Sequence, residues 1–221
     1  MNLQGQTAIA APPQPLPRAI RDSELMKSEG CAIFDRFPGA AVCARLLAES
    51  RLCLQGAVTT AITTSDDEEV RGGNPARRFI SAGGGSEQMA FCNDPKTMRF
   101  LSEICNAPVR PTGECGTYAY YARPGDHLAL HRDIETCDIA VVTCLLDRHG
   151  EGSSGGLTRY YPDRPHEPLS RIRATPDDGA MRVRVPVGST LVMFGGIVAH
   201  LIEPVAAGEL RVVSILCFSV S

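Results

Sequence analysis

The chain has no tryptophan, only two lysines and no long apolar run. The lysines are Lys27 and Lys96, so arginine supplies almost all of the positive charge, and the formal net charge is −3. This balance excludes the basic surface with which proteins bind DNA or RNA. No apolar stretch approaches the ~18 residues that a membrane span needs. We therefore expect neither a nucleic acid nor a membrane as a partner.

Paired cysteine motifs and a secretory signal are also missing. The nine cysteines are odd in number and include no CxxC pair. The N-terminal stretch MNLQGQTAIAAPPQPLPRAI is rich in proline and lacks an apolar segment. A disulfide framework in a secreted protein would show the opposite features. We expect a cytoplasmic protein whose cysteines are reduced and serve mostly as small core residues.

The remaining sequence fits one domain preceded by an arm. With 221 residues, of which 43% are hydrophobic, the chain can bury a sizeable core. Residues 1–18 hold four prolines and few large apolar side chains, which predicts a flexible arm. We expect residues 19–221 to form a single domain, with helical support over about 19–106 and a barrel core over about 110–221.

Helices are predicted mainly in the first half. The stretches RDSELMKSEG, AAVCARLLAES and NDPKTMRFLSEICN show helical spacing of apolar residues, and Asp94 with Pro95 forms a helix start in the third. CAIFDRF predicts a strand between the first two helices. Residues 55–90 are rich in Thr, Asp, Gly and Arg, which predicts loop with short strands.

Short strands are predicted in the second half. Turns of Gly, Pro and Asp separate β-branched or aromatic runs, namely GTYAYYAR, HLALH, CDIAVVTCLL, GGLTRYY, MRVRVPV, STLVMF and RVVSILCFSV. Residues 147–180 are too polar for a core and predict a loop near one mouth of the fold. The chain is therefore predicted to be α+β with a mostly β core, either a sandwich or a barrel, with helices packed outside.

The stretch GDHLALHRD, residues 125–133, ends with His131 and Asp133 two positions apart. Residues i and i+2 of a strand point to the same side. Of the histidines that follow, His149 and His166 lie in polar loops, whereas His200 comes after a strand and an apolar approach. Two imidazoles and a carboxylate from different strands would form the facial triad of non-heme Fe(II) oxygenases, which leaves coordination positions open.

Arg211 opens the last apolar strand, with Val213, Ile215 and Cys217 on the same face. A lone guanidinium among apolar neighbours is costly unless it meets an anion. A bidentate clamp on the carboxylate of a ligand would satisfy it. A salt bridge at the strand edge, to Glu203 or Glu209, would satisfy it equally well.

The order His131-x-Asp133, then VGSTLVMF and His200, then Arg211 resembles the Fe(II)/2-oxoglutarate-dependent oxygenase superfamily, in its small-molecule hydroxylase branch. The resemblance covers roughly residues 110–221. It implies a double-stranded β-helix, a jelly-roll or cupin-like barrel, with N-terminal supporting helices. It also implies that His131, Asp133 and His200 ligate Fe(II) as the catalytic centre, and that Arg211 holds the far carboxylate of 2-oxoglutarate.

The chain departs from this superfamily at two positions near Arg211. Many relatives place Ser or Thr two residues after the arginine, where this chain has Val213. We expect help for the cofactor carboxylate from a residue on a flanking strand. The candidates are Tyr118, Tyr120, Tyr121 and Thr143. Cys217 stands where nucleic-acid demethylases carry a second arginine, which again excludes DNA or RNA as substrate.

The predicted activity is hydroxylation of an unactivated C–H bond with O2, releasing succinate and CO2, with ascorbate as an auxiliary reductant. We expect a small substrate, such as a free amino acid or a natural-product intermediate, because the chain ends directly after its last predicted strand. Charged residues near the mouth that could recognise such a zwitterion are Arg78, Glu114, Arg123, Glu135 and Arg159. A protein hydroxylase of the prolyl or lysyl type and a non-oxidative, cupin-like metal-binding barrel remain alternatives. The oligomeric state is left open.

Overall fold

The computed structural model describes residues 18–66, 69, 71–113, 116–150 and 152–221. The predicted arm therefore lies outside the described residues, apart from Arg18, which opens the first helix. Two short helices, α1 (Arg18–Arg21) and α2 (Glu24–Lys27), precede strand β1 (Cys31–Phe34). No helix in the described part of the chain is long and apolar enough to cross a membrane.

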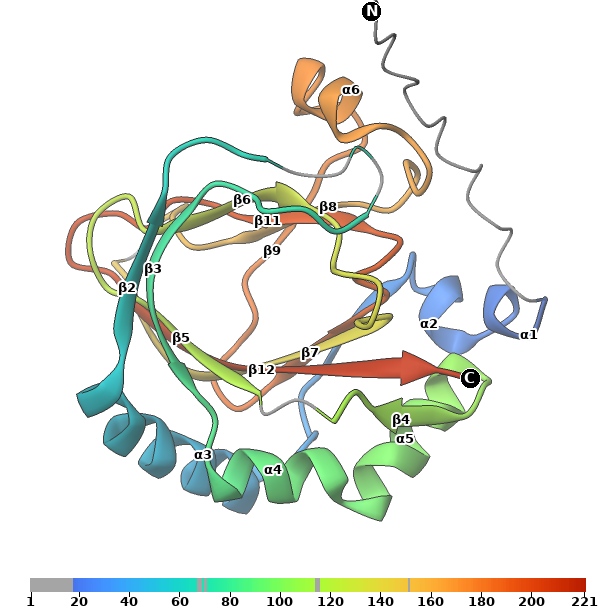
Figure 1. Ribbon diagram of the computed structural model, residues 1–221, viewed down its shortest axis with the longest axis horizontal. Coiled ribbons are helices and arrows are strands. Elements are labelled where there is room, and N and C mark those ends of the chain that lie inside the picture. The colour runs from blue at the N-terminus through green and yellow to red at the C-terminus, as the bar shows by residue number, and fades with distance from the viewer. Residues whose placement is uncertain (1–17, 67–68, 70, 114–115, 151) are drawn as a thin grey trace, which may run out of the picture.

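The helical layer follows β1. It consists of α3 (Ala40–Cys53), the 3-10 turn η1 (Leu54–Gly56), α4 (Ser86–Asn93) and α5 (Pro95–Cys105). Two strands, β2 (Val58–Ile62) and β3 (Arg77–Gly83), form a hairpin between α3 and α4. In Figure 1 the helices α3, α4 and α5 lie along one side of the molecule, below strands β5, β7 and β12.

The barrel strands occupy the second half of the chain. They are β4 (Val109–Pro111), β5 (Thr117–Tyr121), β6 (His127–His131), β7 (Ile139–Arg148), β8 (Thr158–Tyr161), β9 (Met181–Val183), β10 (Thr190–Met193), β11 (Ala199–Ile202) and β12 (Leu210–Val220). Helix α6 (Leu169–Ala174) interrupts them between β8 and β9.

These strands form two facing layers that curl around a common interior (Figure 1). We call β1, β10, β7, β12 and β5 the major sheet, and β6, β11, β8 and β9 the minor sheet. Strand β3 pairs with both β5 and β6, so it joins the two layers along one side. All these pairings are antiparallel. This is the strand arrangement of a double-stranded β-helix, as the sequence predicted.

The alternation of side chains along β12 separates the interior from the helical layer. Val212 and Leu216 pack with Leu46 of α3 and Leu101 of α5 in the main apolar core. Val213, between them, belongs to a separate cluster on the opposite face of the strand. Because successive strand residues face opposite sides, the helices cover the outer face of the major sheet, and the odd-numbered residues of β12 line the barrel interior.

Glu49 of α3 connects the helical layer to the barrel. Its carboxylate accepts hydrogen bonds from the backbone N–H groups of Gly85, Glu87 and Gln88 at 2.7–3.3 Å, and from the hydroxyl of Tyr118 at 2.7 Å. The cap residue of α4, Gly85, has no side chain of its own, so Glu49 supplies the anion that a helix N-terminus favours.

Most predicted elements are confirmed, with three differences. The stretch before residue 90 contains α4, which is short and whose N-terminus is stabilised by the distant Glu49 rather than by a local cap. The predicted mouth loop, residues 147–180, contains α6, whose Leu169 and Ile172 pack on the outer face of the minor sheet. The apolar approach to His200 is a turn up to Val198, and His200 is the second residue of strand β11.

The expectation that all cysteines are reduced is wrong for one pair. Cys137 and Cys217, 80 positions apart, form a disulfide. Cys137 lies on the loop after β6 and Cys217 lies on β12, so their spacing in the sequence carries no pairing signal. The free cysteines Cys31, Cys43, Cys53, Cys105 and Cys144 are half-buried or buried, as expected of core residues, and Cys92 is buried as well.

We predict that Glu49→Gln lowers the free energy of unfolding by about 1–3 kcal/mol, because buried donors would face an amide instead of a carboxylate. Burial opposes ionisation of Glu49, but the donors at Tyr118 and the α4 N-terminus outweigh it and lower its pKa below the ordinary 4.5. A depressed pKa stabilises the folded state above the unfolded pKa. The difference between wild type and variant, measured by urea denaturation, should shrink as the pH falls below about 4.5. A difference that is constant from pH 7 to pH 3 would contradict this account.

Candidate metal centre

The candidate centre lies where β6 and β11 pair. His131 is the last residue of β6, and in the antiparallel register it stands directly opposite His200 of β11. Directly opposed residues share one face of a sheet. The two imidazole rings lie 4.2 Å apart between centroids. Asp133 follows two positions later, on the loop that leaves β6.

These three side chains converge. Oδ1 of Asp133 lies 3.5 Å from Nε2 of His131 and 3.8 Å from Nε2 of His200. One ligand atom from each residue lies within 4.8 Å of the others. The structure thus brings together the three residues predicted as ligands. Two imidazole nitrogens and one carboxylate oxygen on one side of an ion match the ligand set of a divalent first-row metal.

Backbone carbonyls orient both imidazoles. Nδ1 of His131 lies 2.9 Å from the carbonyl oxygen of Ala129, and Nδ1 of His200 lies 3.0 Å from that of Val198. A carbonyl only accepts, so each Nδ1 donates its proton and each Nε2 keeps a lone pair toward Asp133. Burial and the neighbouring His131 lower the pKa of His200 to about 4. His200 is therefore a neutral imidazole at neutral pH, as metal ligation requires.

The surroundings of Asp133 favour its charged form and fix its position. Burial opposes its ionisation, but the two nearby imidazoles and Arg71 outweigh this and lower its pKa. Its backbone N–H donates to the carbonyl of Gly195 at 2.8 Å. A Cβ at Gly195 would lie 1.8 Å from Oδ2 of Asp133, and one at Gly196 would lie 2.5 Å from the Arg71 guanidinium. Glycines are therefore required at both positions so that the Asp133 loop can approach.

Arg71 binds the backbone of the loop that carries Asp133. Its guanidinium donates to the carbonyl oxygens of Asp133, Ile134 and Glu135 at 2.8–3.2 Å and to the carboxylate of Asp138 at 3.0 Å. One planar group with several fixed donors can satisfy several carbonyls of a turn at once. The loop that carries Asp133 is therefore fixed at both of its ends.

Arg132, between the two ligands, is 1% exposed. Its guanidinium donates to the carbonyl oxygens of Ile197, Arg164 and Glu167 at 2.8–3.0 Å. Burial lowers its pKa to about 10, so the group stays charged at neutral pH. It fastens the end of β6 to the segment that leads into β11, which stabilises the spacing of His131 and His200.

Arg211 faces the interior at the opposite end of the barrel. It stands opposite Tyr121 of β5 and Asp147 of β7, and it is 2% exposed. Its Nη1 lies 3.5 Å from Oδ2 of Asp147, so neither Glu203 nor Glu209 is its ion-pair partner. The same carboxylate accepts hydrogen bonds from Arg184 at 3.0 and 3.2 Å. Arg184 therefore binds Asp147 more closely than Arg211 does, and Glu209 lies 4.0 Å from Arg184 as a second carboxylate.

Tyr121 lies next to Arg211 on the interior face. It is 1% exposed, and its ring packs on Phe79 with centroids 5.3 Å apart. Within the described residues its hydroxyl has no hydrogen-bond partner. Burial raises the pKa of Tyr121, so the phenol keeps its proton and is available as a donor. Tyr121 lies on β5, which pairs with β12, and it packs in the same cluster as Val213. Val213 occupies the position at which many oxygenases carry Ser or Thr.

The other residues predicted to contact the cofactor face away from the interior. The hydroxyl of Tyr118 binds Glu49, and that of Tyr120 donates to the carbonyl of Ser50 at 2.5 Å. Thr143 pairs with Thr190 at 2.8 Å and stands opposite Ser214 on the same outer face. The prediction for Tyr118, Tyr120 and Thr143 is wrong because strand parity directs them toward the helical layer.

The charged residues predicted to bind substrate are dispersed. Arg78 and Arg123 both pair with the buried Asp126, in the turn before β6. That turn lies a full strand, about 13 Å, from His131. Arg159 lies on the outer face of β8, where Glu203 at 2.5 Å satisfies it. These three arginines therefore do not gather at the triad, and their part in substrate binding stays a prediction.

The two acidic candidates have different outcomes. Glu135 is exposed on the loop after Asp133, and its carbonyl is held by Arg71. Glu114 lies outside the described residues.

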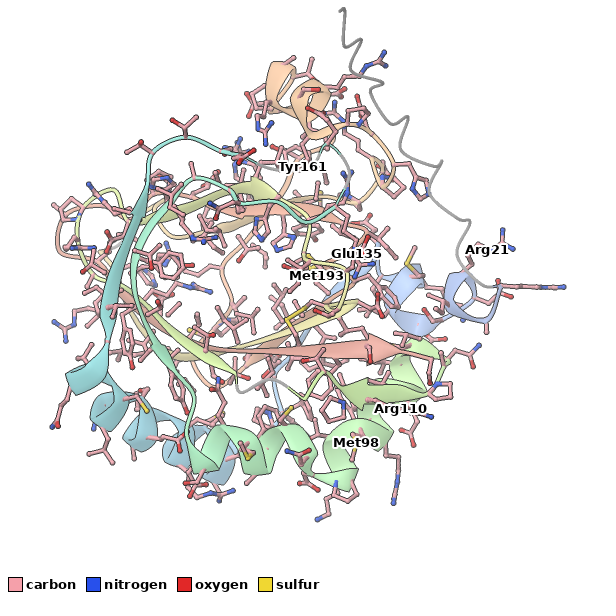
Figure 2. All side chains as sticks on the ribbon, viewed as in Figure 1. Arg21, Met98, Arg110, Glu135, Tyr161 and Met193 are labelled. Atoms are coloured by element: carbon pink, nitrogen blue, oxygen red, sulfur yellow. A yellow bond between two sulfur atoms is a disulfide. The ribbon has the colours of Figure 1, made fainter. Side chains whose placement is uncertain are left out.

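Figure 2 shows the two directions that strand side chains take. Met193 points inside the curl of the sheets, and Tyr161 points toward α6.

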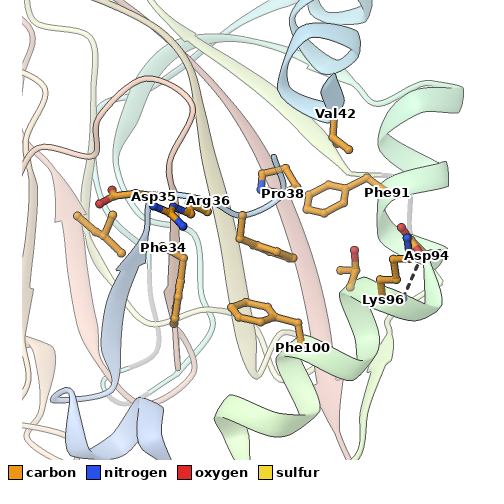
Figure 3. Close-up of a pocket in the computed structure, with 12 residues that line it drawn as sticks. Phe34, Asp35, Arg36, Pro38, Val42, Phe91, Asp94, Lys96 and Phe100 are labelled. Carbon is orange, nitrogen blue, oxygen red and sulfur yellow. Dashed lines mark hydrogen bonds between the residues drawn. The ribbon is translucent and has the colours of Figure 1, made fainter. Parts of the chain in front are cut away.

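A separate hollow of about 510 Å³ lies outside the barrel (Figure 3). Its walls come from the end of β1 and from α4 and α5, with the rings of Phe34, Phe91 and Phe100 around it. Phe34 and Phe100 pack edge to face with centroids 4.9 Å apart. None of the predicted site residues lies in this hollow, so it is distinct from the candidate metal centre.

Sequence reasoning missed Arg71, Gly195 and Asp147, and it missed the structural role of Arg132. The sequence offers one signal, the pair Gly195-Gly196 directly before the segment that ends in His200. Two adjacent glycines there indicate a close approach by another segment. The contacts of the two arginines with carbonyl oxygens carry no pattern in the sequence, because any segment of backbone offers the same acceptors.

No protein-family profile matches the chain, and no curated protein matches it. Solved structures do. A prolyl-4-hydroxylase from Pseudomonas putida superposes with a TM-score of 0.56 at 15% identity, covering 90% of this chain and 97% of that one. The non-heme alpha-ketoglutarate-dependent epimerase SnoN from nogalamycin biosynthesis gives 0.64 at 13%, covering 86% and 76%. EctD from S. alaskensis, with 2-oxoglutarate and 5-hydroxyectoine, gives 0.61 at 14%, covering 97% and 79%.

These identities establish the fold alone. The chain has the double-stranded β-helix fold of Fe(II)/2-oxoglutarate oxygenases, as its motifs predicted. The barrel brings His131, Asp133, His200 and Arg211 onto one interior, in the chain order that the resemblance implied.

We predict that Gly195→Ala weakens binding of a divalent metal at least tenfold, because the new methyl group occupies the position of the Asp133 carboxylate. Titration with Mn(II), followed by the electron paramagnetic resonance signal of the free ion, would measure the affinity. The matched control is Gly56→Ala, whose Cβ meets nothing within 4 Å. Equal affinities in the two variants would show that the space left by Gly195 does not determine the position of Asp133.

Proposed function

We propose that the protein is an Fe(II)- and 2-oxoglutarate-dependent oxygenase that hydroxylates a C–H bond of a small molecule. The observation that carries this proposal is the facial triad of His131, Asp133 and His200 on the same barrel interior as the buried Arg211. A candidate metal site at one end and a buried guanidinium with a single, long ion pair at the other suit a ligand that is chelated at one end and carries a carboxylate at the other.

The residues fit Fe(II). The donor set is two imidazoles and one carboxylate, and the Cys137 sulfur, 3.8 Å from Asp133, belongs to a disulfide and is not a free thiolate. Such a set suits a hard to intermediate divalent ion and leaves one side of it open. His131, Asp133 and His200 would hold the metal. When bound, the iron and the oxo acid supply the oxygen activation and the oxidative decarboxylation that drive the reaction.

The residues around Arg211 fit the far carboxylate of 2-oxoglutarate. Arg211 would give a charge-assisted hydrogen bond, and the unpartnered phenol of Tyr121 would give a second. Arg184 already binds Asp147 closely, so the guanidinium N–H groups of Arg211 that Asp147 does not use would be left for a ligand carboxylate. Tyr121 thereby takes the place of the Ser or Thr that Val213 lacks.

The interior wall beside the metal centre would exclude water. Tyr160 stands opposite His200 on β8 and packs with Met193 and Val198. An apolar wall strengthens the electrostatic interactions inside the site and protects a reactive site from solvent. The Tyr160 hydroxyl also has no hydrogen-bond partner within the described residues, which offers one polar contact to a largely apolar substrate.

Hydroxylation is the proposed outcome because the carboxylate of Asp133 is present, whereas halogenating relatives lack it. A small molecule is the proposed substrate, with free amino acids as one class to screen. The residues first predicted to recognise a zwitterion do not gather at the triad, so natural-product intermediates with apolar bodies are equally suitable. A peptide hydroxylase remains the second candidate, because one structural neighbour is a prolyl-4-hydroxylase.

The test is anaerobic addition of Fe(II) and 2-oxoglutarate to metal-free protein. We predict a visible charge-transfer band that is absent in His200→Ala. Arg211→Met and Tyr121→Phe should keep the band but need more 2-oxoglutarate to reach it. Losing a charge-assisted hydrogen bond costs about 1.5–3 kcal/mol, or about 10–150-fold in affinity, for Arg211→Met, and the loss should be smaller for Tyr121→Phe.

The matched control is Arg159→Ala, which removes an arginine from the outer face of the barrel and should leave the 2-oxoglutarate titration unchanged. Succinate release across amino acids, natural products and proline-containing peptides would then identify the substrate class. Bound Fe(II) with no band at any 2-oxoglutarate concentration would refute the oxygenase and favour the non-oxidative metal-binding barrel.

A further inference from the structure

The disulfide of Cys137 and Cys217 lies beside the candidate metal centre. Cys137 ends the short loop that begins at Asp133, and Cys217 is on the last strand, β12. The bond therefore ties the loop carrying a metal ligand directly to the major sheet. Cys137 is 1% exposed and Cys217 is half-buried, so Cys217 is the more accessible of the two to a small reductant.

The two oxygens of Asp133 have different surroundings. Oδ1 faces the imidazoles of His131 and His200. Oδ2 faces Gly195 and lies 3.8 Å from Sγ of Cys137. A disulfide sulfur carries no proton, so the oxidised pair leaves Oδ2 without a hydrogen bond from that side. A thiol in the same place would be a donor.

We propose that Cys137–Cys217 is a reversible redox site that controls the metal affinity of the centre through the position of Asp133. This inference rests on the proposed function, because it concerns the regulation of the same metal site. The oxidised pair holds the carboxylate in place for metal binding. Reduction releases the tether and gives Oδ2 a thiol donor, and both changes draw Asp133 away from the imidazoles.

The reaction is a thiol–disulfide exchange with a dithiol as reductant. A thiolate of the dithiol attacks the Cys217 sulfur, which breaks the S–S bond and leaves Cys137 as a thiolate that takes up a proton. The second thiol of the reductant then displaces Cys217 from the mixed disulfide. The protein pair gains two electrons and two protons, and the dithiol becomes a cyclic disulfide.

The change is confined to the loop because Asp138 holds its far end in either redox state. Its backbone N–H donates to the carbonyl of Phe218 at 3.0 Å, and its carboxylate accepts from the N–H of Val220 at 2.9 Å and from Arg71 at 3.0 Å. Reduction therefore removes the covalent support of the loop at Cys137 without detaching strand β12, and leaves the loop held by the hydrogen bonds of Arg71. The barrel is expected to stay folded while the ligand set loosens.

The experiment compares metal binding by the oxidised and reduced full chain. Metal-free protein is reduced with a dithiol, the reductant is removed by gel filtration under argon, and Mn(II) is titrated as a redox-stable probe with detection by electron paramagnetic resonance. Alkylation and mass spectrometry of a denatured aliquot show whether Cys137 and Cys217 are paired. We expect the Mn(II) dissociation constant to rise about tenfold or more on reduction, as for other changes next to metal ligands, and to recover on reoxidation.

Two variants separate the redox effect from a loss of stability. Cys137→Ala/Cys217→Ala should bind Mn(II) weakly and equally before and after the dithiol treatment. The control Cys105→Ala removes a buried cysteine from α5, away from the barrel interior, and should respond to the dithiol as the wild type does. Circular dichroism confirms that each sample is folded at the temperature of the titration.

The outcomes are distinct. Equal affinities of oxidised and reduced wild type, or tighter binding after reduction, would overturn the redox control while leaving the oxygenase proposal intact. A pair that stays reduced in an oxidising dithiol–disulfide buffer would overturn it as well. No Mn(II) or Fe(II) binding in either form would remove the proposed function and the redox inference together.

Discussion

The antiparallel register of β6 and β11 is the constraint on which the site depends. It places His131 opposite His200, with the two rings on the interior face and their centroids 4.2 Å apart. A slip of one residue would turn either imidazole to the outer face, because side chains alternate along a strand. Arg132 opposes such a slip, since its buried guanidinium binds carbonyls on the segment before β11 and on the segment after β8. A buried charge next to the two imidazoles therefore stabilises their geometry.

The third ligand is held by a different principle. Asp133 lies on a loop, where backbone freedom is greater than on a strand, so its position must be fixed by contacts. Gly195 permits the approach, Arg71 binds the loop carbonyls, and the disulfide ties the loop to β12. The candidate metal centre thus combines two side chains positioned by sheet pairing with one positioned by a loop that is held by several separate contacts. A control point is more easily built into the loop than into the strands.

The sequence predicted the strands, the fold class and the triad, because strand periodicity and the order of polar residues within apolar runs are local signals. His200 stood out by its apolar approach, and Arg211 by its apolar neighbours. Contacts that depend on three-dimensional packing could not be predicted from the sequence. Tyr118 and Tyr120 have the composition of pocket residues, yet the parity of β5 turns them toward Glu49 and Ser50 and leaves Tyr121 inside. The Cys137–Cys217 pair joins positions 80 residues apart and leaves no trace in cysteine spacing.

Strand pairing also places the charged residues around Arg211, at the other end of the barrel from the triad. Asp147 and Arg211 stand opposite each other on β7 and β12, and Arg184 approaches the same carboxylate more closely, at 3.0 Å against 3.5 Å. Glu209, 4.0 Å from Arg184, is a second buried carboxylate, so two positive and two negative charges balance in this group. The longer distance from Arg211 to Asp147 leaves guanidinium N–H donors that a carboxylate of a ligand could use. In the proposed complex, a dicarboxylic acid chelated at the triad would meet Arg211 and the phenol of Tyr121 with its second carboxylate.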